Sequence, residues 1–183
     1  MYSSSDTLGD PRGGQMMRNA SPSQQLDIMQ GVMLHQEWDH LLVFTVADCS
    51  FALDVRGIIE VQVDVDARQL YEPVGPVTHS VPFRGFIIAG VSSERAFGVK
   101  CSMGNQMVVL DLEEQPVGLL VDRIVGLYEA GPAGVMRLPA WLQGCSQTPA
   151  VVAFQDSHGS LVLVLDGTRL FSRAEVDVLK SFG

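Results

Sequence analysis

Two stretches near the N-terminus contain residue types that can bind ligands. Residues 9–14 read Gly-Asp-Pro-Arg-Gly-Gly, and glycine-rich loops cradle phosphate when a strand precedes them and a helix follows. This stretch follows no strand pattern and lacks the Gly-Lys-Ser/Thr ending of a phosphate-binding loop. Metal-ligating types stand at His35, Glu37, Asp39 and His40. Their irregular spacing favours solvated polar side chains, so we expect neither a nucleotide site nor a metal site.

The nucleophiles and acids elsewhere lack the partners that catalysis needs. The three cysteines are far apart and form no Cys-x-x-Cys pair, so we expect buried or half-buried thiols in a reducing compartment. Residues 144–146 do not complete the Gly-x-Ser-x-Gly turn of a serine hydrolase. The sequence therefore predicts no catalytic residue, no cofactor and no enzyme. The isolated candidates are Cys49, Cys101 and Cys145, the histidines His79 and His158 in expected loops, and the acids Asp111, Glu113, Glu114 and Asp122.

The composition limits the class of protein. Hydrophobic residues make up 46% of the 183 residues, which is enough for a buried core. The net charge of −9 argues against nucleic-acid binding, because phosphate backbones require clustered Lys and Arg. No apolar run approaches the roughly 18–20 residues of a membrane helix, and the start lacks the basic and apolar regions of a secretory signal. We expect a cytoplasmic protein without direct membrane insertion.

The first forty residues differ from the rest of the chain. Residues 1–20 are rich in Ser, Gly, Asn and Asp, which is typical of a disordered tail. The pair Ser21-Pro22 then starts a predicted short amphipathic helix that ends near Leu34. This helix either docks on the domain or on a partner, or it is a packed or frayed extension. We assign residues 1–39 to a flexible extension and residues 40–183 to the domain.

From residue 41 the apolar pattern changes to that of short strands. Leu41–Val46 is apolar and β-branched, a polar turn follows, and Phe51–Val55 alternates. Glycine or polar turns separate the later runs, as in β-barrels and sandwiches. A capping-box pattern from Ser172 to Glu175 opens a last helix through Phe182. The other predicted strands are Ile58–Val63, Phe86–Ala89, Ala96–Cys101, Met107–Leu112, Val117–Val121, Val125–Tyr128, Ala150–Phe154 and Leu161–Leu165.

An internal repeat supports two β units. Residues 41–61, shifted by 66 positions, fall on residues 107–127 without a gap, and the turns of the two segments coincide. A looser match sets residues 87–89 against residues 151–153. Two small units packed together explain this repeat, because one unit alone has unprotected edges and little core.

Several of these runs resemble the CheW domain of chemotaxis coupling proteins and of the chemotaxis histidine kinase. Residues 41–61 resemble the family's opening strands, which end in a Val-x-Glu-Val-like pattern, here Ile58-Ile59-Glu60-Val61. The most specific motif, Gly-Leu-Leu-Val-Asp, stands at residues 118–122, and the family's closing pattern resembles residues 153–166. The resemblance covers about residues 40–171. It implies an all-β fold of two intertwined SH3-like five-stranded barrels, in addition to the short N-terminal and C-terminal helices.

Between the two halves the family carries Gly-Val-Ile-Asn-Leu-Arg-Gly, a hairpin used in receptor and kinase contacts. The nearest match is residues 90–96, which keep the Gly-Val and the Arg. The resemblance implies that Arg95 is the hairpin arginine, the alternative being an exposed, solvated charge. The other implied partner-binding residues are Gly90 and Val91, which would shape the hairpin, and Ile58 and Glu60 on a neighbouring surface. A structural role is implied for Gly118, Leu119, Val121 and Asp122, as a close-packed strand with a turn-setting carboxylate.

The resemblance implies a function by binding. We expect a non-catalytic signalling adaptor that holds a chemoreceptor's cytoplasmic tip and the regulatory domain of a chemotaxis histidine kinase in fixed relation. Because residues 90–96 depart from the family pattern, a CheW-like scaffold in a different chemosensory or surface-motility pathway, with altered partners, is the alternative. A small β-barrel enzyme or ligand-binding protein would need a pocket with convergent polar groups, and the sequence indicates none.

Overall fold

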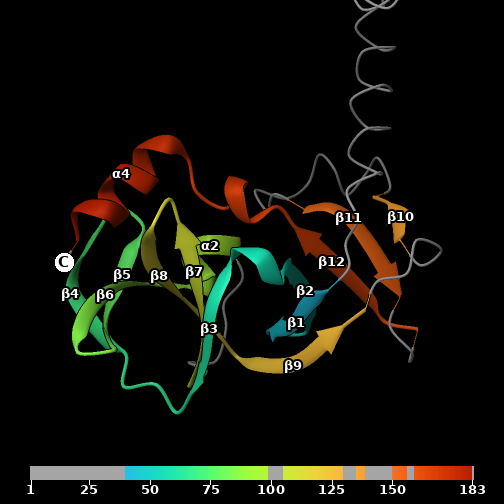
Figure 1. Ribbon diagram of the computed structural model, residues 1–183, viewed down its shortest axis with the longest axis horizontal. Coiled ribbons are helices and arrows are strands. Elements are labelled where there is room, and N and C mark those ends of the chain that lie inside the picture. Colours follow the sequence, from blue (N-terminus) through green and yellow to red (C-terminus); the bar gives the residue numbers. More distant parts are fainter. Residues whose placement is uncertain (1–39, 99–104, 130–134, 139–149, 156–158, 183) are drawn as a thin grey trace, which may run out of the picture. The chain divides into compact units, whose positions relative to one another are not determined.

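The chain between residues 40 and 182 is built mainly from short antiparallel and parallel strands. The computed structural model describes residues 40–98, 105–129, 135–138, 150–155 and 159–182 (Figure 1). The helix predicted near residues 21–34 lies outside the described residues, and the extension at 1–39 stays a prediction. The elements are β1 (Leu41–Val46), β2 (Cys49–Asp54), η3 (Val55–Gly57), β3 (Ile58–Val63), β4 (Arg68–Val74), β5 (Val77–Phe83), β6 (Phe86–Ser92), α2 (Ser93–Phe97), β7 (Gln106–Leu112), β8 (Gln115–Val121), β9 (Arg123–Tyr128), β10 (Val135–Arg137), β11 (Ala150–Gln155), β12 (Leu161–Leu165), η4 (Gly167–Arg169) and α4 (Arg173–Ser181).

These strands form two six-stranded sheets. Sheet A has the order β10-β11-β12-β2-β1-β9, and sheet B has the order β3-β7-β8-β6-β5-β4. All neighbours are antiparallel except β12 with β2 and β6 with β8, which are parallel. The expected all-β class is confirmed, and the chain passes from sheet A to sheet B and back.

The internal repeat corresponds to the triplets β1-β2-β3 and β7-β8-β9. In each triplet the first two strands form a hairpin, and the third crosses to the other sheet. There β3 pairs with β7, and β9 pairs with β1. The third strand of each copy is thus exchanged, which is the physical sense in which the two units are intertwined (Figure 1). We call β3 and β9 the crossing strands.

The looser sequence match between residues 87–89 and residues 151–153 is wrong. Residues 87–89 lie in β6, which pairs in parallel with β8. Residues 151–153 lie in β11, whereas the strand that pairs in parallel with β2 is β12. By its place in the sheet β6 corresponds to β12, so the match joined strands that are not equivalent.

The main core joins the two sheets. Phe44 and Phe51 of sheet A and Val108 and Leu119 of sheet B belong to one cluster and are at most 2% exposed. The ring of Phe97, from α2, stacks on Phe51 with 4.9 Å between centroids. Burial of each such side chain contributes roughly 1.5–3 kcal/mol. This shared core couples the two sheets.

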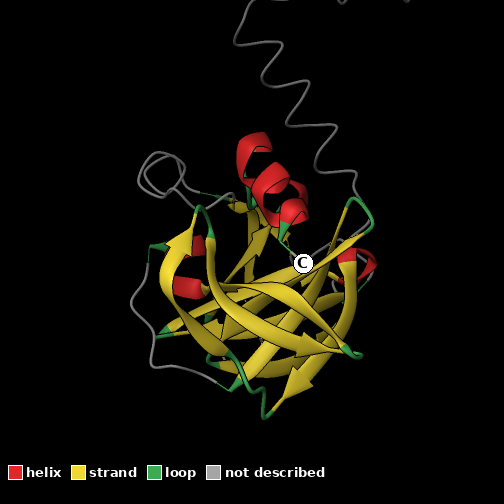
Figure 2. Ribbon diagram, turned by 90° about the vertical axis from the view of Figure 1, so that its left-hand side faces the viewer, coloured by secondary structure: helices red, strands yellow, loops and turns green. Residues whose placement is uncertain are grey.

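The sequence prediction is wrong for one helical segment, α2, and confirmed for the other, α4. The strand predicted at Ala96–Cys101 is wrong where it is described, because Ala96 and Phe97 belong to α2. The C-terminal helix is confirmed, with Ser172 as N-cap and a reciprocal capping box with Glu175. Figure 2 shows α4 lying across the ends of the strands, and its Val176 and Leu179 are buried in the main core.

Candidate functional site

An ion pair joins the crossing strand β3 to the turn between β5 and β6. Arg84 donates to Glu60 Oε2 from Nη2 at 2.6 Å and from Nε at 3.0 Å. Gln62 Nε2 donates to the other carboxylate oxygen at 2.9 Å. These hydrogen bonds, first from Gln62 and then from Arg84, lower the pKa of Glu60. Because β3 is an edge strand of sheet B, the pair ties that edge to the β5–β6 hairpin.

The β5–β6 hairpin presents a cation next to apolar side chains. Phe83 pairs with Phe86, so only Arg84 and Gly85 form the turn, with φ of 48° and 86°. Positive φ at both positions is the backbone of a type I′ turn, which glycine adopts freely. The Arg84 guanidinium lies 5.0 Å from the Phe83 ring centroid, within cation–π range. After the turn, Phe86 is 71% and Ile87 52% exposed.

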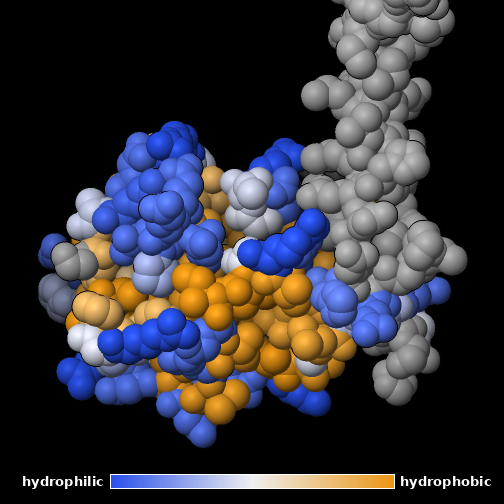
Figure 3. All heavy atoms as spheres, in the orientation of Figure 1, coloured by the Kyte–Doolittle hydropathy of each residue, from blue (hydrophilic) through white to orange (hydrophobic). Residues whose placement is uncertain are grey.

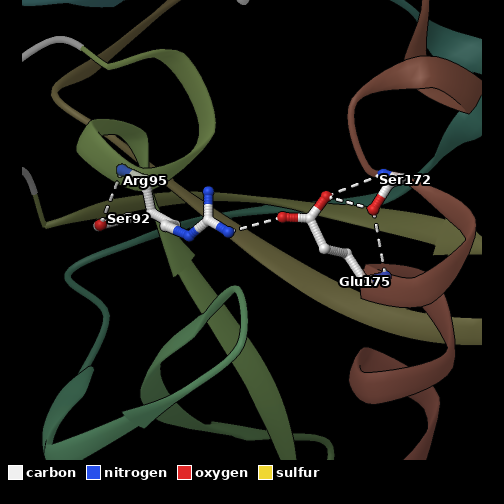
Figure 4. A network of polar contacts seen from close by, with 4 residues as sticks. All are labelled: Ser92, Arg95, Ser172 and Glu175. Carbon is white, nitrogen blue, oxygen red and sulfur yellow. Dashed lines mark hydrogen bonds and ion pairs between the residues drawn. The ribbon is translucent and has the colours of Figure 1, made fainter.

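Arg95 does not lie in a hairpin, and that part of the sequence prediction is wrong. It belongs to the five-residue helix α2, which follows β6 and has Ser92 as its N-cap. Arg95 Nη2 donates to Glu175 Oε1 at 2.6 Å, and Glu175 Oε2 accepts from the Ser172 backbone N–H at 2.9 Å and hydroxyl at 2.8 Å (Figure 4). Arg95 therefore joins α2 to the C-terminal helix.

Gly90 and Val91 lie within β6, in one strand of the β5–β6 hairpin and away from its turn at Arg84 and Gly85. Val91 is fully buried in the main core. A Cβ on Gly90 would lie 2.7 Å from Val81 Cγ2 and 3.0 Å from His79 Cβ. Gly90 is thus a point of close packing between β5 and β6.

The arginine that stands at an observed hairpin turn is Arg84, not Arg95. The family's hairpin pattern ends in Leu-Arg-Gly, and Phe83-Arg84-Gly85 stands at the observed β-turn. The signal available in the sequence was an Arg-Gly pair between two apolar runs, Val77–Phe83 and Phe86–Ser92. The Gly-Val at residues 90–91 also fits the start of the family pattern, which is why the pattern was placed on residues 90–96.

The crossing strands expose apolar side chains at equivalent positions of the repeat. On β3 the residues Ile59, Val61 and Val63 are exposed, and Ile58 packs against the main core. Both strands are sheet edges, so no further strand among the described residues pairs with their outer side. Figure 3 shows hydrophobic atoms gathered over the region of β3 and β9. We define the crossing-strand surface as Ile59 (39% exposed), Val61 (38%), Val63 (62%), Val125 (54%) and Leu127 (70%).

The Gly-Leu-Leu-Val-Asp motif lies in β8 and at its end. Leu119 and Val121 are buried in the main core. A Cβ on Gly118 would lie 2.3 Å from Met107 Sδ, which leaves room only for hydrogen at this position. The Asp122 carboxylate accepts from the backbone N–H of Ala47 at 2.6 Å. It thereby fastens the β8–β9 connection to the β1–β2 turn.

The other residues considered for catalysis or metal binding do not form a common site in the described part of the chain. His79 lies in β5 and is 2% exposed, so its expected loop position is wrong. Within the described ranges, no group of three or more His, Cys, Asp or Glu side chains could hold a metal ion. Cys49 is an exposed free thiol, whereas Cys101, Cys145, His35 and His158 lie outside those ranges. No helix in the described part of the chain is long and apolar enough to cross a membrane.

Comparison with known proteins agrees with this architecture. A profile of the CheW-like domain matches residues 40–175. Among solved structures, the chain is similar to the crystal structure of scaffolding protein TtCheW from Thermoanaerobacter tengcongensis. That likeness has a TM-score of 0.61 and 17% identity, and covers 73% of this chain and 92% of the other; it shows a shared fold. No curated protein matches. Because the profile spans well over half of its length, the chain belongs to the CheW-like domain family.

Proposed function

We propose that this protein is a non-catalytic adaptor that couples chemoreceptors to a chemotaxis histidine kinase in the cytoplasm. It would bind the receptor's cytoplasmic tip and the kinase's regulatory domain at the same time, so that a movement of one partner reaches the other. Family membership supports the adaptor class. The observation that carries the proposal is the crossing-strand surface. The Glu60–Arg84 ion pair lies on the other face of the same strand β3.

The crossing-strand surface has the chemistry of a protein-binding site. Contiguous exposed apolar side chains on a folded domain mark interaction surfaces. Successive outward residues of β3, such as Ile59, Val61 and Val63, stand about 6.6 Å apart along a strand. Residues four apart on a helix rise about 6 Å. An amphipathic helix at a receptor tip can therefore set its apolar residues against this strand one for one.

The Glu60–Arg84 ion pair adds accessible charge to β3 on its other face, where the strand meets the β5–β6 hairpin. Its side chains are partly exposed, 32% for Glu60 and 60% for Arg84, so a partner can reach either group. Charges at the margin of an interface select partners and orient them more than they add affinity. Arg84 also extends over the Phe83 ring, and arginine beside aromatic residues is frequent at binding hot spots.

Binding measurements on surface variants test the proposal. Glu60→Lys places two cations together and is expected to weaken binding of a receptor tip fragment about tenfold or more. Arg84→Ala should weaken binding several-fold, and Val61→Ser should act similarly through the lost apolar contact. Affinity is measured by titration calorimetry with the full chain, against the receptor fragment and the kinase regulatory domain separately.

Two arginines provide matched controls for Arg84. Arg68→Ala removes an exposed cation on β4 that pairs with Asp66, and Arg95→Ala removes the cation that pairs with Glu175. Both variants should bind like the wild type. If folded Glu60→Lys and Arg84→Ala retain full affinity for both partners, the proposed surface is wrong. If Arg95→Ala alone abolishes binding, the arginine first assigned from sequence is the anchor.

A CheW-like scaffold in another chemosensory or surface-motility pathway is the second candidate. Pro82 and Phe83 stand where the family pattern has Asn and Leu, and side chains at a hairpin tip influence partner choice. The same calorimetric titrations, repeated with receptor and kinase domains from each chemosensory system of the source genome, separate the two candidates. Preference for partners outside the chemotaxis system would favour the second.

A further inference from the structure

A buried histidine stands beside β4, an edge strand of sheet B. His79 is 2% exposed and pairs across the sheet with Gly90 of β6 and Gln69 of β4. On the far side of Gly90 the register continues to Gly118 of β8. Gly90 and Gly118 are neighbours across the sheet. Because they have no side chains, they leave space for the imidazole but offer it no polar side-chain group.

The hydrogen bonds around His79 fit only the neutral ring. The Thr78 hydroxyl accepts from the Ser92 backbone N–H at 2.8 Å and donates to the Gly90 carbonyl at 3.2 Å. Its one proton is then used, so His79 Nδ1, at 2.8 Å from the same oxygen, is the donor to it. Nε2 is left as a bare lone pair, buried and without a hydrogen-bond partner in the described residues. A proton added there would be a buried cation facing no acceptor.

The strand next to His79 is attached at few points. β4 is the last strand of sheet B, and its register with β5 is interrupted between Gln69 and Val74. Six of its seven residues are exposed, and Leu70 alone is half-buried against the main core. Tyr71, in the interrupted part, is 98% exposed. Few buried apolar contacts mean a low free energy of local opening.

We propose that protonation of His79 releases the edge strand β4 from β5, so that this side of sheet B opens on mild acidification. Removal of β4 turns β5 into the sheet edge and gives the imidazole access to water. The charged groups in register around it do not offset the added charge. On β4 they are the exposed Arg68 and Glu72, and Arg68 pairs with Asp66. β6 carries no charged residue. Glu60, on the opposite edge strand β3, is already paired with Arg84 in the β5–β6 turn.

The direction of the effect follows from burial. Desolvation lowers the pKa of His79 in the folded state. A histidine with a lowered folded pKa contributes stability that is complete above its unfolded pKa and is lost as pH falls toward the folded value. The opening constant of β4 should therefore rise by up to about tenfold between pH 7 and pH 5.5.

Hydrogen exchange of the full chain tests this inference and does not depend on the proposed partners. After correction for intrinsic rates, the amides of Arg68–Val74 should exchange up to about tenfold faster at pH 5.5 than at pH 7, while those of β7 and β8 change little. In the variant His79→Asn, whose amide nitrogen can replace Nδ1 as donor, this pH dependence should disappear. His40→Gln is the control, because His40 is exposed, and it should behave as the wild type.

NMR of the wild-type imidazole keeps the test decisive if His79→Asn does not fold. Nitrogen shifts should show the Nδ1–H tautomer, and the ring should titrate below an ordinary histidine. Titration at or above the ordinary value overturns the inference. So does exchange that accelerates equally in every strand, or exchange in β4 that is independent of pH.

Discussion

At the scale of single residues, the centre of sheet B depends on glycine where two elements approach each other. Replacement of Gly118 by Ala would place a methyl group 2.3 Å from Met107 Sδ, and both residues lie in neighbouring central strands. Overpacking of a dense core costs about 1–3 kcal/mol. We expect Gly118→Ala to lower the free energy of unfolding by about 2 kcal/mol, measured by urea denaturation.

Another glycine and the methionine itself provide controls for this prediction. A Cβ on Gly57 would have no heavy atom within 4 Å, so Gly57→Ala should change stability little. In the double variant, Met107→Ala should cost less in the Gly118→Ala background than alone, since the methyl group fills part of the vacated space. Equal losses for Gly57→Ala and Gly118→Ala would contradict close packing as the reason.

The residue scale also shows why one arginine was assigned and another missed. The position of Glu60 was predictable, because the alternating pattern of residues 58–63 places it on a strand. A short motif match carries no information on backbone turns, so Arg95 was matched to a hairpin. The Ser92 N-cap and Glu94 in the first turn are helix-start signals that favour α2 there. The Glu60–Arg84 ion pair itself required the tertiary structure, because its residues are separated by 24 positions.

At the scale of elements, the C-terminal helix is held by one carboxylate with two roles. Glu175 completes the capping box with Ser172 and also pairs with Arg95 (Figure 4). The backbone hydrogen bond from Ser172, with contributions from its hydroxyl and from Arg95, lowers the pKa of Glu175. A carboxyl with a lowered folded pKa contributes stability above its unfolded pKa, and that stability is lost as pH falls through the folded value.

We therefore expect Glu175→Gln to destabilise the protein by about 1 kcal/mol at pH 7. The difference from wild type should shrink toward zero as pH falls below about 4, where the wild-type carboxyl is protonated. Urea denaturation at a series of pH values measures both effects. Asp177→Asn on the same helix, which removes only an exposed contact with Arg173 at 3.6 Å, should have a smaller effect. A constant difference at all pH values would contradict the assignment to charge.

Three of the elements that the sequence did not reveal are β4, β5 and α2. β4 is almost wholly exposed and lacks the apolar alternation of a half-buried strand. β5 has a buried alternate face, but His79 takes one of the buried places and Pro82 interrupts the run. α2 has only five residues, and buried Phe97 holds it to the core. Tertiary packing, which local patterns do not encode, determines β4 and β5 and adds to the helix-start signals of α2.

At the scale of the whole molecule, the repeat predicted two copies of a β unit but not the exchange of their third strands. Periodicity shows that segments are similar, whereas pairing depends on where the chain crosses. Each crossing strand completes the sheet that holds the first two strands of the other copy. The parallel pairs β6–β8 and β12–β2 also join the first half of the chain to the second.

This exchange predicts the behaviour of the chain when it is divided between α2 and β7. The strand pairs β1–β9, β3–β7, β6–β8 and β12–β2 would each have one strand in either fragment. The main core would likewise be divided between the two fragments. Neither fragment should fold alone, because each would keep hairpins with unpaired edges and only part of a core. Co-expressed fragments should associate into a complex with the β-sheet circular dichroism of the intact protein and cooperative unfolding. If either fragment alone unfolds cooperatively, the two β units are independent domains, and the exchange of β3 and β9 is not what unites them.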